Sequence, residues 1–161
     1  MNWQAVSAVA DILAATGVII SAIYLVRQLR GAVQAVRAST MQSITSDASQ
    51  FNYLFFGSAE FTKIILTGYN DEYLDMVDAY RFRRFMHSYF SFHENLHFQF
   101  KNKTLDEELW NGYLAALERI ISYPGCQNWW RDNFEMHSNA FQDLINKLLA
   151  AAKELRNQGT K

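Results

Sequence analysis

Two histidines and a glutamate in residues 93–97 have the types and spacing of a zinc site. The segment reads His93-Glu94-Asn95-Leu96-His97, which has the H-E-x-x-H form of zinc peptidases. On a helix the two histidines lie one turn apart on the same face, where both can bind zinc. The glutamate can then act as general base on a metal-bound water. The motif therefore predicts a zinc-dependent hydrolase as one hypothesis for function.

The motif lacks an evident third ligand, which a catalytic zinc requires together with an open coordination position. Glu118 and His137 are the candidates, and neither belongs to a second recognisable motif. Gln99 also stands where the peptidase signature usually has an apolar residue. The simpler interpretation is that His93 and His97 border an aromatic core and find ordinary hydrogen-bond partners. Non-catalytic metal binding is a third interpretation, and we favour the simpler one, with no cofactor.

Two other clusters could bind a ligand or a membrane surface. Residues 81–84 hold three arginines next to acidic side chains, so that Arg81 can pair with Asp78 three residues earlier or face anionic headgroups. A solvated helix face is the interpretation that we prefer for this cluster. Trp129 and Trp130 could bind a ligand or lie against the membrane, but we expect them to pack in the core.

The motif falls in the middle of a long expected helix, roughly Glu72 to Asn102. Its apolar and aromatic residues recur every three or four positions, which is typical of a helix. A helix this apolar around its circumference is usually surrounded by others. The residues of its main stripe are Phe82, Phe85, Tyr89, Phe92, Leu96 and Phe100.

The rest of the chain also predicts helices, because it has one proline, seven glycines and apolar residues at helical spacing. The last of these helices carries apolar positions from Phe141 to Leu155. Gly57 is expected to end the first helix, and Ser58 to cap a short helix that Gly68 closes. Thr104 and Glu107 are expected to form a capping box, and Pro124 to break the helix that follows this box.

An uncharged apolar segment lies near the N-terminus, from Ile12 to Val26. About 20 mostly apolar residues suffice to cross the roughly 30 Å hydrocarbon layer of a membrane as a helix. A span over residues 8–27 places Asp11 within one turn of the outer boundary, where water can reach it. Trp3 and Tyr24 then fall near the two interfaces, where amphipathic aromatic rings are favoured. The segment therefore predicts a transmembrane helix.

The flanks of this segment indicate its orientation. Arg27, Arg30 and Arg37 follow it and no basic residue precedes it, so the N-terminus is expected outside and the remainder in the cytoplasm. A cleaved signal peptide fits less well because it begins with basic residues. A buried helix of a soluble protein is the main alternative, and a peripheral segment is another. The single Cys126, which cannot form an intrachain disulfide, agrees with a cytoplasmic domain.

These observations predict an all-α protein in which the transmembrane helix continues into an antiparallel cytoplasmic bundle of about four to five helices. The net charge of −1 offers no basic surface for nucleic acid. The expected organisation is an anchor at 1–30, a juxtamembrane helix at 31–57, a bundle at 58–156 and a disordered tail at 157–161.

The juxtamembrane helix also has an apolar face that could bring two copies together. Small residues within the span, at Ala14, Gly17, Ser21 and Ala22, would allow close approach of two helices. The alternative is that the last helix, through Leu144, Leu148 and Leu155, covers the same face within one chain. The positions of that face are Val33, Val36, Ile44, Phe51 and Phe55.

The segment from Ile20 to Arg30 resembles the anchor of a widespread group of small uncharacterised bacterial membrane proteins. The resemblance covers nearly the whole chain and continues through Glu94-Asn95, Gln99, Leu105-Asp106, Leu109-Trp110, Pro124-Gly125 and Trp129-Trp130. It implies one inner-membrane anchor and a cytoplasmic helical domain with no established activity. Glu94 and Asn95 are typical of the group, whereas His93 and His97 are not, which counts against a zinc peptidase. We therefore expect a non-enzymatic interaction or regulatory module whose partners are the bilayer and a second copy or another membrane protein.

Overall fold

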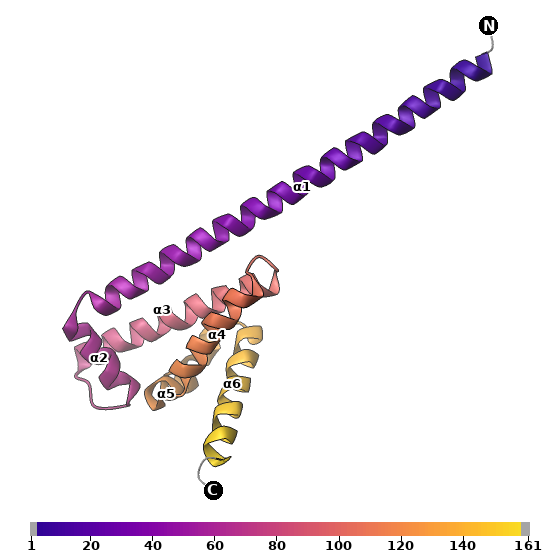
Figure 1. The fold of residues 1–161 in the computed structure, drawn as a ribbon. Helices are drawn as coiled ribbons and strands as arrows, with labels where there is room; N and C mark the ends of the chain where they lie inside the picture. The colour runs from indigo at the N-terminus through magenta and orange to yellow at the C-terminus, as the bar shows by residue number, and fades with distance from the viewer. Residues whose placement is uncertain (1–2, 159–161) are drawn as a thin grey trace. The chain divides into compact units, whose positions relative to one another are not determined.

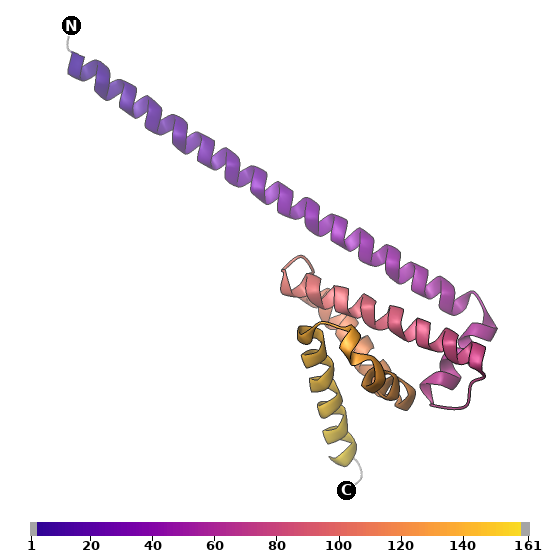
Figure 2. The same ribbon diagram turned by 180° about the vertical axis from the view of Figure 1, so that it is seen from behind.

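The computed structural model describes residues 3–158, and all regular structure in that range is helical (Figures 1 and 2). The all-α prediction is therefore confirmed. Nothing is described for residues 159–161 of the expected tail, nor for the side chains of Asp11, Ile12, Phe55 and Leu155. The helices are α1 (Trp3–Phe56), α2 (Ala59–Tyr69), α3 (Met76–Lys101), α4 (Glu107–Ile121), α5 (Pro124–Asn133), the short 3₁₀ helix η1 (Phe134–Met136) and α6 (Asn139–Gln158).

The chain divides into an N-terminal unit, Met1–Thr40, and a C-terminal unit, Met41–Lys161. The described part of the N-terminal unit is one continuous stretch of α1, so it contains no second element against which its apolar side chains could pack. The part of α1 from Leu13 to Tyr53 contains a segment that is long and apolar enough to cross a membrane, with a mean hydropathy of 1.3. No residue of that segment is buried.

Helix α3 is the central element of the C-terminal unit. It packs against α2, α4 and α5, while α4 also contacts α5 and α6. After the loop of residues 102–106, α4 runs back along α3 (Figure 1). The larger core cluster joins α2, α3, α4, α5 and α6, and its fully buried members include Ile65, Met86, Phe90, Leu117 and Phe141.

The last turns of α1 belong to this core. Ile44 is only 2 % exposed and packs in a second cluster with Leu96, Leu105 and Trp110. Phe51 is half-buried, with its ring centroid 5.4 Å from that of Phe92. Part of the apolar face considered for self-association is therefore core within one chain.

Helix caps confirm some of the expected boundaries. The Ser58 side chain accepts a hydrogen bond from Phe61 N, which caps α2 as predicted. Helix α3 begins later than expected, because the Asp75 carboxylate accepts from Val77 N and Asp78 N, both at 2.9 Å. Pro124 stands in the first turn of α5, where its missing N–H costs no hydrogen bond.

Two local predictions are wrong. The predicted capping box at residues 104–107 does not form, since Asp106 is the cap of α4 and Thr104 bonds to Gln99 instead. Gly68 does not close α2, which continues to Tyr69. Gly68 is buried inside the helix because its α-carbon lies directly against the ring of Phe82.

Candidate functional site

Helix α3 places the three side chains of the predicted zinc motif in three different environments. His93 lies among tyrosine and phenylalanine rings, Glu94 reaches the segment that precedes α6, and His97 lies beside Trp110. The rings around His93 come from α3 itself and from α4, whereas those around His97 come from α4 and α6. The motif is therefore best described one residue at a time.

His93 is 2 % exposed. Its Nδ1 donates to the carbonyl oxygen of Tyr89 at 2.9 Å, and its Nε2 has no hydrogen-bond partner in the described part of the chain. Burial lowers the pKa of His93 to about 4, although the hydrogen bond that the ring donates to the Tyr89 carbonyl works in the opposite direction. The imidazole is therefore neutral at pH 7.

Glu94 connects α3 to the start of α6. Its Oε2 accepts from Nδ1 of His137 at 2.6 Å, and its Oε1 accepts from the backbone N–H of Ser138 at 2.7 Å. Burial opposes ionisation of this carboxyl, but the hydrogen bonds from Ser138 and His137 outweigh it and lower the pKa of Glu94. Both oxygens are thus engaged in holding two segments together, which is not the geometry of a general base on water.

His97 lies between two aromatic rings, with its centroid 5.6 Å from that of Trp110 and 6.0 Å from that of Phe141. Burial, and then the nearby Lys101, lower its pKa. Of the two candidates for a third zinc ligand, His137 is bound to Glu94 and Glu118 is exposed on α4.

Within residues 3–158, no three histidine, cysteine, aspartate or glutamate side chains are grouped so that they could hold a metal ion. Glu94 is bound to His137 and Ser138, and the two histidines lie among different sets of aromatic rings. The geometry therefore does not bring together the ligand set on which the zinc hypothesis depends.

His93 forms part of a hollow of about 790 Å³, which we call the aromatic groove. It lies within the C-terminal unit, between the last turns of α1, helix α3 and helix α4. Arg119 lines it from α4. Its aromatic side chains are Phe51, Tyr69, Phe85, Tyr89, Phe92 and Tyr113.

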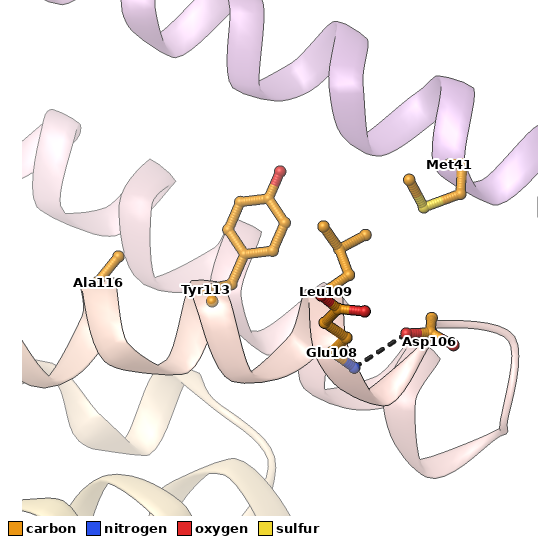
Figure 3. A pocket seen from close by; sticks show the side chains of 7 residues that line it. Met41, Asp106, Glu108, Leu109, Tyr113 and Ala116 are labelled. Atoms are coloured by element: carbon orange, nitrogen blue, oxygen red, sulfur yellow. Dashed lines mark hydrogen bonds between the residues drawn. The ribbon is translucent and has the colours of Figure 1, made fainter.

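A second hollow, of about 660 Å³, shares Gly112, Tyr113 and Ala116 with the aromatic groove. Figure 3 shows this second hollow, with the side chains of Leu109 and Tyr113 rising from α4 and Met41 contributed by α1. It is also lined by two acidic residues, Asp106 and Glu108, and the Asp106 carboxylate accepts from Glu108 N at 2.9 Å. The shared residues make the two hollows neighbours along α4, with the acidic side chains in one and the basic Arg119 in the other.

The other sequence candidates have structural roles. Trp129 and Trp130 are buried, and the Trp129 ring stacks on Phe90 at 5.1 Å between centroids, so the expectation of core packing is confirmed. Cys126 is buried, and burial raises the pKa of its thiol to about 12, which makes it unreactive as a nucleophile.

Arg81 pairs with Asp78 at 3.3 Å, as its spacing predicted. It also pairs with Glu60 of α2 at 2.9 Å, a partner that the sequence did not indicate. This arginine is half-exposed and binds acidic side chains of its own chain, so the interpretation as a solvated helix face holds for it.

The residues predicted to lie at the membrane interface are all on α1. Trp3 and Tyr24 are 73 % and 63 % exposed, and Arg27 and Arg30 are exposed as well. Their spacing along one continuous helix places the two aromatic rings about 30 Å apart along its axis, at 1.5 Å per residue.

The aromatic groove and its Arg119 were missed in the sequence. One signal could have indicated them: Gly112, Ala115 and Ala116 form a small, exposed face on the otherwise bulky α4. The partnership of Glu94 with His137 was also missed, because the two residues are far apart in the chain and no local pattern connects them.

Comparison with known proteins gives no match for this chain among family models, curated proteins or solved structures.

Proposed function

We propose that this protein is a membrane-anchored interaction or regulatory module without catalytic activity of its own. In this proposal residues 1–30 are a single transmembrane anchor in a bacterial inner membrane, and the helical bundle of residues 58–156 lies in the cytoplasm. The observation that carries it is the apolar stretch of α1 from Leu13 onward, which is long enough to cross a membrane and is not buried. In water such a surface is far larger than the apolar patches that soluble monomers usually expose.

Three further features support the anchor. The distance of about 30 Å between Trp3 and Tyr24 along the helix axis matches the thickness of the hydrocarbon layer. The aliphatic side chains between them favour insertion, at about −0.3 to −0.6 kcal/mol each near the centre of the span. Arg27 and Arg30 follow directly, which supports a cytoplasmic location for everything after them. The resemblance to small bacterial membrane proteins points the same way.

The non-enzymatic part of the proposal is supported by the separate roles of the motif residues. His93 is buried and neutral, Glu94 binds Ser138 and His137, and His97 packs on aromatic rings. The partners that we propose are the bilayer and either a second copy or another membrane protein. Among the described positions of the face considered for self-association, Val33 and Val36 are more than half exposed and available for such a contact.

The anchor can be tested with a matched pair of variants in the full chain. Ile19→Arg with Ile20→Arg adds two charges near the centre of the proposed span, at about 2.5–3.5 kcal/mol each on insertion scales. We expect this variant to leave the membrane fraction, whereas Val33→Arg with Val36→Arg, outside the span, stays in it. A C-terminal fluorescent protein should fluoresce and a C-terminal alkaline phosphatase should be inactive. Recovery of the unchanged chain in the soluble fraction would exclude the anchor, and phosphatase activity would reverse the topology.

Metal analysis tests the alternative of a zinc hydrolase. We expect protein purified without a histidine tag to contain far less than one zinc per chain, because the described side chains of the motif are not grouped with a third ligand. His93→Ala should leave that metal content unchanged. Stoichiometric zinc that disappears in His93→Ala and in His97→Ala would establish the enzyme hypothesis instead.

A further inference from the structure

We propose that the aromatic groove binds a single-chain anionic amphiphile, of which a free fatty acid is the simplest example. The acyl chain would lie along the aromatic wall and the carboxylate at Arg119. The groove volume of about 790 Å³ is within the range of about 300–1,000 Å³ that is usual for small-molecule sites. All of its lining belongs to the C-terminal unit, so this inference does not depend on the membrane anchor.

The wall of the groove suits an apolar chain. The ring of Phe51, on α1, contacts two rings of α3. Its centroid lies 6.4 Å from that of Tyr89, edge to face, and 5.4 Å from that of Phe92, at a tilt. These three rings are only half-buried, although they are among the largest side chains of the unit. A chain of methylene groups lying against them would remove further apolar surface from water, which is the main source of affinity in such sites.

The charge of the groove selects an anion. Arg119 is the only permanently charged side chain among the described residues that line it, since His93 is neutral at pH 7. Arg119 is exposed, and it takes part in none of the ion pairs found within residues 3–158. A guanidinium binds a carboxylate through two parallel hydrogen bonds. The neighbouring hollow contains Asp106 and Glu108, which repel a carboxylate and so favour the orientation with its head at Arg119.

Helix α4 leaves room for the chain beside its backbone. A Cβ atom added to Gly112 would meet no heavy atom within 4 Å apart from its chain neighbours and the backbone of its own helical turns. Ala115 and Ala116 continue this small, exposed face toward Arg119. Tyr113 lines both hollows, and in Figure 3 its hydroxyl points away from the backbone of α4.

Photolabelling of the full chain tests this inference. The probe is palmitate with a diazirine at the end of its chain, and the protein is in phosphatidylcholine nanodiscs or, if it fractionates as soluble, in buffer. Intact mass measures the amount of label, and tryptic mapping of the unchanged chain locates it. We expect label in peptides 85–101 and 104–119, displaced by unlabelled palmitate but not by hexadecyltrimethylammonium.

The variants separate charge from shape. Arg119→Gln should weaken palmitate binding about tenfold, the lower end of the range for a charge-assisted hydrogen bond, and Arg119→Lys should restore part of it. Ala116→Leu should fill the groove and abolish labelling of these peptides. The matched control is Arg84→Gln, an exposed arginine of α3 that does not line the groove.

Circular dichroism of each variant establishes that it is folded. Three results would overturn the inference: label confined to residues 13–30, equal binding by folded Arg119→Gln, or equal competition by the cationic amphiphile. The first of these would leave the proposed anchor intact, so a failure of the groove and a failure of the anchor give different results.

Discussion

Replacing Gly125 by alanine is expected to lower the free energy of unfolding of the C-terminal unit by about 3 kcal/mol or more. Helices α2 and α5 meet at this position without an intervening side chain. A Cβ atom at residue 125 would overlap the carbonyl oxygen of Gly68 and lie 3.2 Å from that of Tyr69. Both obstacles are backbone atoms in the buried last turn of α2, so neither can move without separating α2 from α5. A loss of this size is a large share of the stability of an ordinary domain.

Thermal or urea unfolding of the full chain, followed by tryptophan fluorescence, measures this effect, because Trp129 and Trp130 are buried on the same helix. Gly112→Ala is the matched control. Its Cβ meets open space, so the substitution should raise the free energy of unfolding by about 0.5–1 kcal/mol through helix propensity alone. If Gly125→Ala unfolds at the same temperature as the unchanged chain, α2 and α5 do not approach each other as closely as in this structure.

The predictions from sequence succeed where the cause is local. Gly57 ends α1, Ser58 caps α2 and Pro124 begins a new element, because each depends on backbone chemistry within a few residues. The aromatic stripe of α3 likewise follows from periodicity alone. Local rules fail where two candidates compete, as when Asp106 rather than Thr104 caps α4.

The arrangement of the candidate site could not be predicted in this way. Gly68 looks like a helix terminator in the sequence, but it is a point of contact between α2 and the Phe82 ring of α3. Glu94 looks like part of a zinc motif, but its partner His137 is brought to it by the path of three later elements. The aromatic groove needs α1, α3 and α4 at once. Each feature depends on packing between distant segments, about which a single-sequence pattern carries no information.

Lowering the pH from 7 toward 4.5 is expected to destabilise the C-terminal unit through His93. Its pKa is about 4 in the folded state because burial disfavours the imidazolium, whereas the ordinary value is 6.5. Between these two values the unfolded chain binds a proton that the folded chain does not, so stability falls as the pH falls. The slope is about 1.4 kcal/mol per pH unit, and the full window amounts to about 3 kcal/mol.

The urea midpoint of the full chain, measured between pH 7 and pH 5, tests this prediction, and His93→Gln is the decisive variant. Glutamine stays neutral, so its midpoint should change much less with pH, even if the substitution lowers stability uniformly. Glu94 does not affect this measurement. Because its pKa is lowered in the folded state, the stability that it contributes is lost only below about pH 4.3. The pKa of His97 is also lowered, so a smaller slope of the same sign should remain in His93→Gln and decrease further when His97→Gln is added. An unchanged slope in His93→Gln would mean that its imidazole accepts a proton in the folded protein, and therefore that water reaches His93 through the aromatic groove.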